Sequence, residues 1–248
     1  MAGVNVRTDV DLDRPVLVDG LPGVGLVGKI AADHIIEELD LTYFASVTCD
    51  GLPQVAVHDA DRPDVLPPVR LYADATMDLV VLQSDVPVSR TAASDFAACV
   101  TTWLENTDGF PVYISGLPVE NMDVEEVPSL YGVATGDGAA TLSEHDIAGP
   151  SDRGVVGGPT GALLHEAADR DLSGVGLVVE SDPQFPDPAA ARKLIVDGVT
   201  PIAEVEVSTE DLVEQSEQIR EQKQQLAQRM QEVSEEESSQ ARPMRMYQ

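Results

Sequence analysis

One glycine-rich stretch limits the possible folds of this chain more than any other: residues 20–29 read Gly-Leu-Pro-Gly-Val-Gly-Leu-Val-Gly-Lys. The apolar, β-branched run at residues 15–19 comes directly before it and predicts a buried strand. An apolar-periodic segment, residues 26–39, follows and predicts a helix. A glycine loop between a strand and a helix is typical of the first unit of an α/β domain.

Two nucleotide-binding motifs nearly fit this loop. Residues 23–29 match a phosphate-binding loop up to the last position, where Ile30 replaces the Ser or Thr that would hold magnesium, so this interpretation fails. Residues 23–28 match G-x-G-x-x-G, and Asp50 lies where a dinucleotide site needs an acidic residue for ribose. Pro22 before the motif and a second, unrelated glycine loop argue against a dinucleotide site.

The net charge of the chain limits the kinds of partner that it can bind. The chain carries 44 acidic and 15 basic residues, a formal charge of −29, with the acidic residues spread along its length. We interpret this as adaptation to concentrated salt, as in a halophile, where self-repulsion is screened. Such a surface repels phosphate backbones and anionic lipids, which argues against nucleic-acid and membrane partners. With no signal peptide and no apolar run of membrane-spanning length, we expect a cytoplasmic protein.

The rest of the first 207 residues predicts an α/β domain, a three-layer α/β/α sandwich around a mostly parallel, partly antiparallel sheet. The turn at residues 50–53 is short enough to make strands 44–49 and 54–58 an antiparallel pair. Residues 116–152 look irregular except for a strand at 129–134. The remaining elements are strands at 69–72, 78–82, 111–115 and 174–180, and helices at 89–106, at 162–169 and from 188 onward.

The C-terminal part has a different character. Ser208 and Asp211 form a capping pair, and an apolar residue recurs every seven positions from Leu212 to Val233. The companion heptad positions are mostly polar, so the segment is either a solvated helix lying on its own domain or a weak coiled coil. We therefore divide the chain into an α/β domain (1–207), an amphipathic helical stalk (208–240) and a flexible tail (241–248).

The sequence contains no recognisable catalytic or metal-binding constellation. None of His34, His58, His145 and His165 has a second His or Cys at metal-ligand spacing, and Cys49 and Cys99 lie apart in apolar segments. Asp19 alone among the carboxylates is notable, because it ends a strand beside the glycine loop. There it is either a functional group or an acceptor for the loop's backbone amides.

The two glycine loops together resemble those of the archaeal proteasome assembly chaperone family. Residues 19–28 read Asp-Gly-Leu-Pro-Gly-Val-Gly-Leu-Val-Gly, and residues 157–164 read Gly-Gly-Pro-Thr-Gly-Ala-Leu-Leu. Members of that family open with a similar Gly-x-Pro-Gly-x-Gly loop and carry a second glycine-rich turn before a helix. The resemblance covers residues 14–207. It implies a fold similar to that of nucleoside phosphorylases, with no catalytic residues, cofactor or metal, and glycines that serve backbone packing.

The end of the chain extends the resemblance. Proteasome activators and some assembly chaperones end in a hydrophobic–tyrosine–any-residue tripeptide that inserts between proteasome α-subunits. Met246, Tyr247 and Gln248 have this form, and the resemblance implies that they supply the hydrophobic contact, the ring contact and the terminal carboxylate. A homo-oligomer would engage the seven-fold α-ring through several tails at once.

These observations predict an ATP-independent chaperone or adaptor, not an enzyme, that docks on proteasome α-subunits through its C-terminus. The alternative is a small-molecule enzyme of phosphorylase-like or dinucleotide-binding type that uses the loop at residues 20–28.

Overall fold

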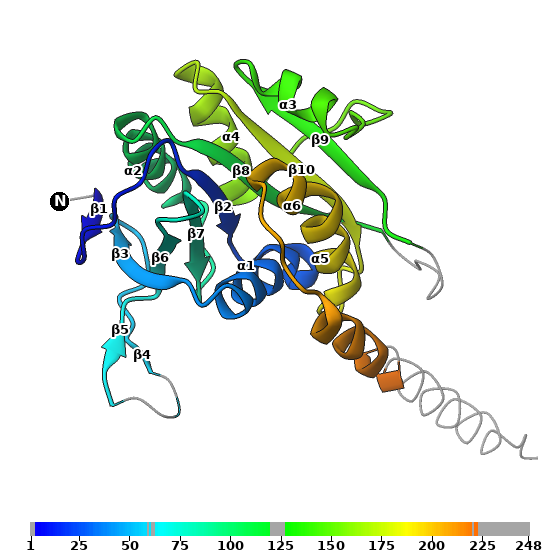
Figure 1. Cartoon of the computed structure of the whole chain (residues 1–248), viewed down its shortest axis with the longest axis horizontal. Helices are drawn as coiled ribbons and strands as arrows, with labels where there is room; N and C mark the ends of the chain where they lie inside the picture. Colours follow the sequence, from blue (N-terminus) through cyan, green and yellow to red (C-terminus); the bar gives the residue numbers. More distant parts are fainter. Residues whose placement is uncertain (1–2, 59, 61–62, 120–126, 220, 223–248) are drawn as a thin grey trace, which may run out of the picture.

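An eight-stranded mixed sheet forms the centre of the computed structural model, in the order β1-β3-β6-β7-β2-β8-β10-β9 (Figure 1). The structure describes residues 3–58, 60, 63–119, 127–219 and 221–222. The strands of this sheet are β1 (Gly3–Val6), β2 (Val16–Gly20), β3 (Thr42–Thr48), β6 (Val69–Asp74), β7 (Leu79–Ser84), β8 (Phe110–Pro118), β9 (Leu130–Thr135) and β10 (Gly174–Ser181).

The centre of the sheet is parallel and its margins are antiparallel. Strands β7, β2, β8 and β10 run side by side in one direction. The pairs β1–β3, β3–β6 and β6–β7 on one side, and β9–β10 on the other, are antiparallel. Central parallel strands are buried on both faces and therefore read as continuous apolar runs, as in β2 and β7. The predicted mixture of parallel and antiparallel strands is confirmed.

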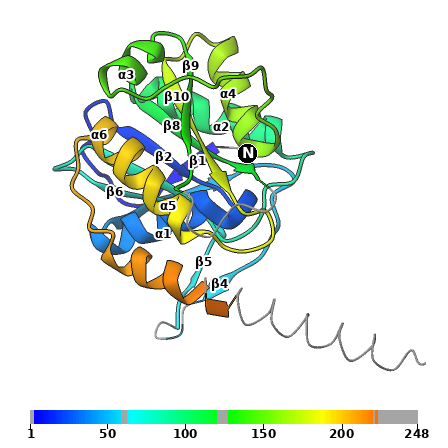
Figure 2. The same cartoon turned by 90° about the vertical axis from the view of Figure 1, so that its right-hand side faces the viewer.

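Helices cover both faces of the sheet, which confirms the predicted three layers (Figures 1 and 2). The helical elements are η1 (Val24–Leu26), α1 (Val27–Glu38), α2 (Ala93–Asn106), α3 (Gly138–Glu144), α4 (Gly158–Asp169), α5 (Pro188–Leu194), the π-helical turn η2 (Ile195–Val199) and α6 (Thr200–Ala203). Helices α1, α5 and α6 share one apolar cluster, and α2 and α4 share the other. Successive residues of a strand point to opposite faces, so Val18 joins the first cluster and Leu17 the second.

The predicted antiparallel pair of strands 44–49 and 54–58 is wrong. Both edges of β3 are already taken, by β1 and by β6. After β3 the chain turns at Gly51, whose φ of +83° favours glycine, and it packs there against Ala92. Residues 57–58 instead form β4 (Val57–His58), which pairs with β5 (Val65–Leu66) in a separate two-stranded sheet.

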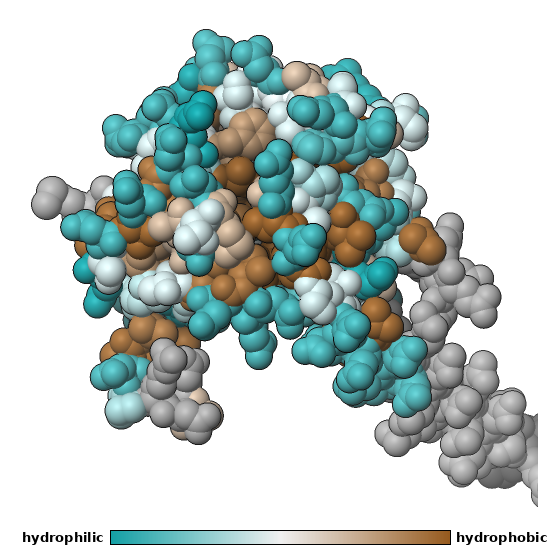
Figure 3. Space-filling model, in the orientation of Figure 1, coloured by the Kyte–Doolittle hydropathy of each residue, from teal (hydrophilic) through white to brown (hydrophobic). Residues whose placement is uncertain are grey.

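The β4–β5 sheet projects from the body of the molecule (cyan in Figure 1). Val65 on β5 and Val55, two residues before β4, are exposed apolar side chains, and hydrophobic atoms are visible on this projection in Figure 3. Two-residue strands are too short to be stable without support from their surroundings.

Helix α3 was not predicted, because residues 116–152 read as irregular apart from one strand. It spans seven residues, of which only Gly138 and Leu142 are buried, too few for a helical period to show in the sequence. Gly138 is needed for close packing, since a Cβ there would lie 2.1 Å from the carbonyl oxygen of Gly174 on β10.

The predicted helix starts are confirmed for α5 and shifted for α2. The Asp187 side chain accepts a hydrogen bond from the Ala190 backbone N–H at 3.0 Å, as expected for a helix N-cap. Helix α2 begins at Ala93, not Ser89, and the Ser89 hydroxyl accepts from the Ala92 N–H in the preceding turn.

The C-terminal helix starts on its own domain. Residues 210–219 and 221–222 are helical, and Leu212 is 1% exposed within the first apolar cluster. Nε2 of His34 on α1 lies 2.6 Å from the Ser208 carbonyl oxygen, which anchors the segment just before the helix. Figure 1 shows the helix (orange) leading away from the sheet. The heptad positions from Lys223 onward lie outside the described residues, so the full stalk stays a prediction.

No helix in the described part of the chain is both long enough and apolar enough to cross a membrane.

Candidate functional site

A groove of about 350 Å³ opens where the two glycine loops meet. The first loop, residues 20–28, follows β2, and the second, residues 154–161, leads into α4. Residues at the end of β8 complete the wall between them. In α/β sheets, ligands bind at the carboxyl ends of parallel strands, and the groove lies at this edge. Sequence reasoning identified both loops, and the structure brings them together.

Close packing explains most of the glycines in the first loop. A Cβ on Gly20 would lie 2.1 Å from the Ala32 Cβ on α1, and one on Gly28 would lie 2.9 Å from the Leu21 carbonyl oxygen. Gly25 has a φ of +60°, and its carbonyl accepts from the Asp187 N–H at 2.9 Å. The loop therefore needs glycine to bring β2, α1 and the start of α5 together. This confirms the packing role for these three positions.

Asp19 ties the two loops together. Its carboxyl is fully buried, with Oδ1 accepting from the Leu21 N–H at 3.1 Å and Oδ2 accepting from the Thr160 hydroxyl at 3.4 Å. The Thr160 hydroxyl also lies 3.0 Å from the Ile114 carbonyl oxygen on β8, so its single hydrogen is shared between the two acceptors. Burial raises the pKa of Asp19 to about 7, although these hydrogen bonds oppose the shift. Of its two interpretations, the loop-anchoring acceptor is the one that the geometry supports.

The groove offers apolar side chains and backbone. Its lining contains no charged residue among the described part of the chain, and its polar side chains are Ser115 and Thr160. A second hollow of about 480 Å³ adjoins it and shares the stretch Val155–Val156, and its charged lining residues are Asp152, Arg153 and Glu180. Glu180 is held there by the Ser129 N–H and the Tyr131 hydroxyl. The apolar lining suits an uncharged group better than a phosphate.

Lys29, the lysine of the near phosphate-loop motif, is engaged elsewhere. Its Nζ lies 2.8 Å from Asp33 Oδ2 and 3.1 Å from Asp85 Oδ1. Asp85 in turn pairs at 2.6 Å with Arg70, whose side chain is 4% exposed. The ammonium group is thus neutralised by two carboxylates, which agrees with the failure of the phosphate-loop interpretation at Ile30.

The sheet order also removes the support for a dinucleotide site. Asp50 follows β3, and two strands, β6 and β7, separate β3 from β2. At a spacing of roughly 4.8 Å between neighbouring strands, Asp50 is too far from the first loop to bind the ribose of a nucleotide held there.

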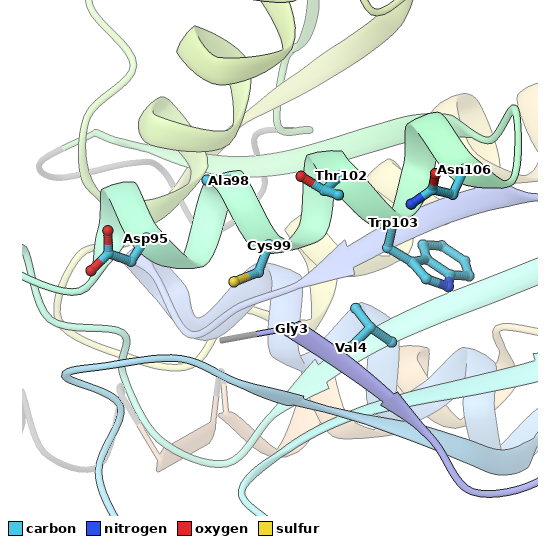
Figure 4. Close-up of a pocket in the computed structure, with 8 residues that line it drawn as sticks. All are labelled: Gly3, Val4, Asp95, Ala98, Cys99, Thr102, Trp103 and Asn106. Carbon is cyan, nitrogen blue, oxygen red and sulfur yellow. The ribbon is translucent and has the colours of Figure 1, made fainter. Parts of the chain in front are cut away.

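The cysteines lie on the other side of the domain. Cys49 directly follows β3 and is buried, and this burial raises the pKa of its thiol to about 11. Figure 4 shows Cys99 on α2 beside a hollow of about 360 Å³, which lies between Trp103 and the edge strand β1. Both thiols are free. Within the described residues, no three His, Cys, Asp or Glu side chains gather as a metal site would require.

The expected partner-binding residues Met246, Tyr247 and Gln248 lie outside the described residues. Sequence reasoning did not single out Thr160 or the apolar groove. Thr160 was quoted only as part of a glycine-rich turn, and nothing in a single sequence shows that its hydroxyl reaches a carboxylate 141 positions earlier.

Comparisons with known proteins identify similar chains over almost the whole length. A model described as the PAC2 family matches residues 17–227. The uncharacterized protein MJ0106 of Methanocaldococcus jannaschii is 27% identical over 214 residues, which cover 86% of this chain and 85% of that protein.

Two solved structures from Pyrococcus furiosus share the fold. PbaA, described as an archaeal homolog of proteasome-assembly chaperone, has a TM-score of 0.76 at 24% identity, covering 98% of this chain and all of that chain. PbaB, described as an archaeal proteasome activator, has a TM-score of 0.79 at 21% identity, covering 91% and 98%.

Proposed function

This chain belongs to the PAC2 family, and we propose that it is a non-enzymatic, ATP-independent proteasome assembly chaperone or adaptor. The observation that carries the proposal is the family match, joined to a fold shared with an archaeal homolog of proteasome-assembly chaperone and with an archaeal proteasome activator. In this proposal the domain at residues 1–207 is the body, with a fold similar to that of nucleoside phosphorylases, and its glycine loops serve architecture and recognition.

The proposed docking element is the C-terminal tripeptide on proteasome α-subunits. Met246 supplies an apolar contact, Tyr247 an amphipathic ring, and Gln248 a carboxylate for a lysine in the pocket. The described helical residues, 210–219 and 221–222, support this arrangement, because the only buried residue among them, Leu212, lies in the first turn, and the helix then leads away from the body (Figure 1). The segment 208–240 would then act as the stalk and 241–248 as the tail.

We further propose that several copies act together. In the described part of the stalk, Ser216 and Ile219 are half-buried on the same side as Leu212, whereas most of the remaining positions are exposed. Since Leu212 packs on its own domain, association of copies as a weak coiled coil would depend on the apolar heptad positions that follow it. Linked tails that reach one α-ring simultaneously gain avidity through effective concentration, without any new contact at each site.

The test is capture of purified proteasome α-subunits in high salt. We expect the chain that lacks residues 246–248, and the Tyr247→Ala variant, to capture at least about tenfold less than the parent, since ring and carboxylate contacts are lost. Gln240→Ala, at the stalk's end, is the matched control and should capture normally. Equal capture by all variants would place the interface on the body. Failure of the parent to capture α-subunits would refute the proposed partner.

We also propose that the protein works in concentrated salt. A charge of −29 on a 26.4 kDa chain repels itself, and salt screens exposed charges within about 3 Å at 1 M. We expect the melting temperature to rise by several degrees when KCl increases from 0.1 M to 2 M, as followed by circular dichroism. The same rise in 2 M sucrose would attribute the effect to solute exclusion, not to screening.

A further inference from the structure

Three glycines at the groove are not explained by packing. A Cβ added to Gly23, Gly154 or Gly157 would meet no described atom within 4 Å. The φ angles of Gly23 (−144°) and Gly157 (−105°) are ones that any residue adopts. Gly20, Gly28 and Gly161 differ, because a Cβ on each would lie within 3 Å of a neighbouring atom. Gly23 and Gly157 line the groove and Gly154 lines the adjoining hollow, so the absence of side chains at these positions leaves both hollows open.

The groove is also apolar on a strongly acidic protein. A quarter of the chain is charged (24%), yet the groove lining has no charge among the described residues. Apolar side chains stand at its rim, where Val155 is 96% exposed and Leu117 is 41% exposed. Exposed apolar side chains around a hollow are typical of an interaction site.

The rim of the groove has free backbone as well. The N–H groups of Gly154, Val155 and Val156 have no hydrogen-bond partner among the described residues, and Gly157 continues the segment in an extended conformation (φ −105°, ψ −175°). Exposed backbone N–H groups beside apolar pockets can hydrogen-bond to an extended peptide, as main-chain groups do when a peptide adds to a sheet edge.

We propose that this groove binds an extended peptide segment of a partner protein, apolar at its centre and flanked by basic residues. The centre would pair with the backbone at residues 154–156 and bury its side chains against Val155 and Leu117. The basic flanks follow from the strongly negative charge of the whole chain; the adjoining hollow itself is lined by two carboxylates, Asp152 and Glu180, and by one guanidinium, Arg153. The site is separate from the C-terminal tripeptide, and it does not depend on the proposed docking to α-subunits.

The probe is a displayed library of random heptapeptides, selected on the immobilised full-length chain in 2 M KCl. We expect the enriched peptides to share an apolar centre with Lys or Arg at the ends. Synthetic versions should bind the Gly23→Leu and Gly157→Leu variants at least about tenfold more weakly by fluorescence anisotropy. Gly3→Leu is the matched control, since Gly3 is equally open but lies on β1, and it should bind like the parent.

Additional measurements separate binding from misfolding and from self-association. Each variant should melt within a few degrees of the parent, and a bound peptide should slow hydrogen exchange at residues 154–156. Enriched peptides that are acidic, or that bind both groove variants as tightly as the parent, would overturn the proposal. A lower oligomer mass of both groove variants in light scattering, with Gly3→Leu unchanged, would assign the groove to a second copy instead and would also overturn it.

Discussion

Replacing Gly20 by alanine is expected to lower the free energy of unfolding by about 3–5 kcal/mol. The added Cβ would lie 2.1 Å from the Ala32 Cβ and 2.7 Å from the Leu82 carbonyl oxygen. Neither neighbour can rotate away, because one is the first carbon of its side chain and the other is backbone. To relieve the clash, α1 would have to move away from β2, an inner strand of the sheet. That movement would also disturb the contacts that Asp19 makes with both loops.

The matched control is Gly23→Ala in the same loop, where the new methyl group meets no described atom within 4 Å. Its free energy of unfolding should change by no more than about 1 kcal/mol, and a small gain is reasonable because alanine restricts the unfolded chain. Urea unfolding followed by circular dichroism in 2 M KCl measures both variants. If both variants lost a similar free energy of unfolding, any side chain in this loop would be destabilising. That result would contradict the packing explanation for Gly20.

The second large effect is a change in pH dependence on replacing Asp19 by asparagine. The carboxyl has a pKa of 3.8 when exposed and about 7 in the folded chain, because burial disfavours its charge. The folded state therefore holds the proton more tightly than the unfolded state. The stability that this proton gives is complete below pH 3.8, falls as the pH rises toward 7, and is absent above it, a loss of about 4 kcal/mol.

An asparagine side chain does not titrate, so the Asp19→Asn variant lacks this loss. We expect its free energy of unfolding, relative to that of the parent, to rise by up to about 4 kcal/mol between pH 4 and pH 8. Urea unfolding at intermediate pH values gives the curve. Asp64→Asn, at an exposed position on the β4–β5 projection, controls for the loss of one negative charge and should stay parallel to the parent. Parallel curves for Asp19→Asn and the parent would mean that Asp19 is ionised in the fold throughout this range.

Local sequence was sufficient for the elements next to the first glycine loop. The apolar run before Gly20 and the periodic run after it were predicted as strand and helix, and both are confirmed as β2 and α1. Each is long enough for its period to show, and the glycines between them leave few other conformations. The helix predicted from residue 188 onward is likewise confirmed, and the Asp187 side chain before Pro188 caps it by accepting from the Ala190 N–H.

Strand order was beyond local reasoning. The pairing of β3 with β1 and β6 depends on residues far away in sequence. The short turn after residue 49 instead suggested that β3 pairs with the next segment of the chain, which is wrong. The groove was missed for the same reason, since a glycine needed for packing and a glycine that faces open space look alike in a sequence. Gly20 and Gly23 stand in one loop, and only their surroundings in the fold separate them.

The distance along the chain between the two sides of the groove affects how a new chain matures. Strand β2 is synthesised early, but it can pair with β8 only after residues 110–118 have been synthesised. The Gly25 carbonyl likewise cannot accept its hydrogen bond until Asp187 has been synthesised. Such long-range pairing is slow compared with local helix formation. The groove therefore cannot form before Val178, the last of its lining residues in the sequence, has been made. A ligand that recognises it distinguishes finished chains from unfinished ones, and by binding only the finished form it draws folding toward completion.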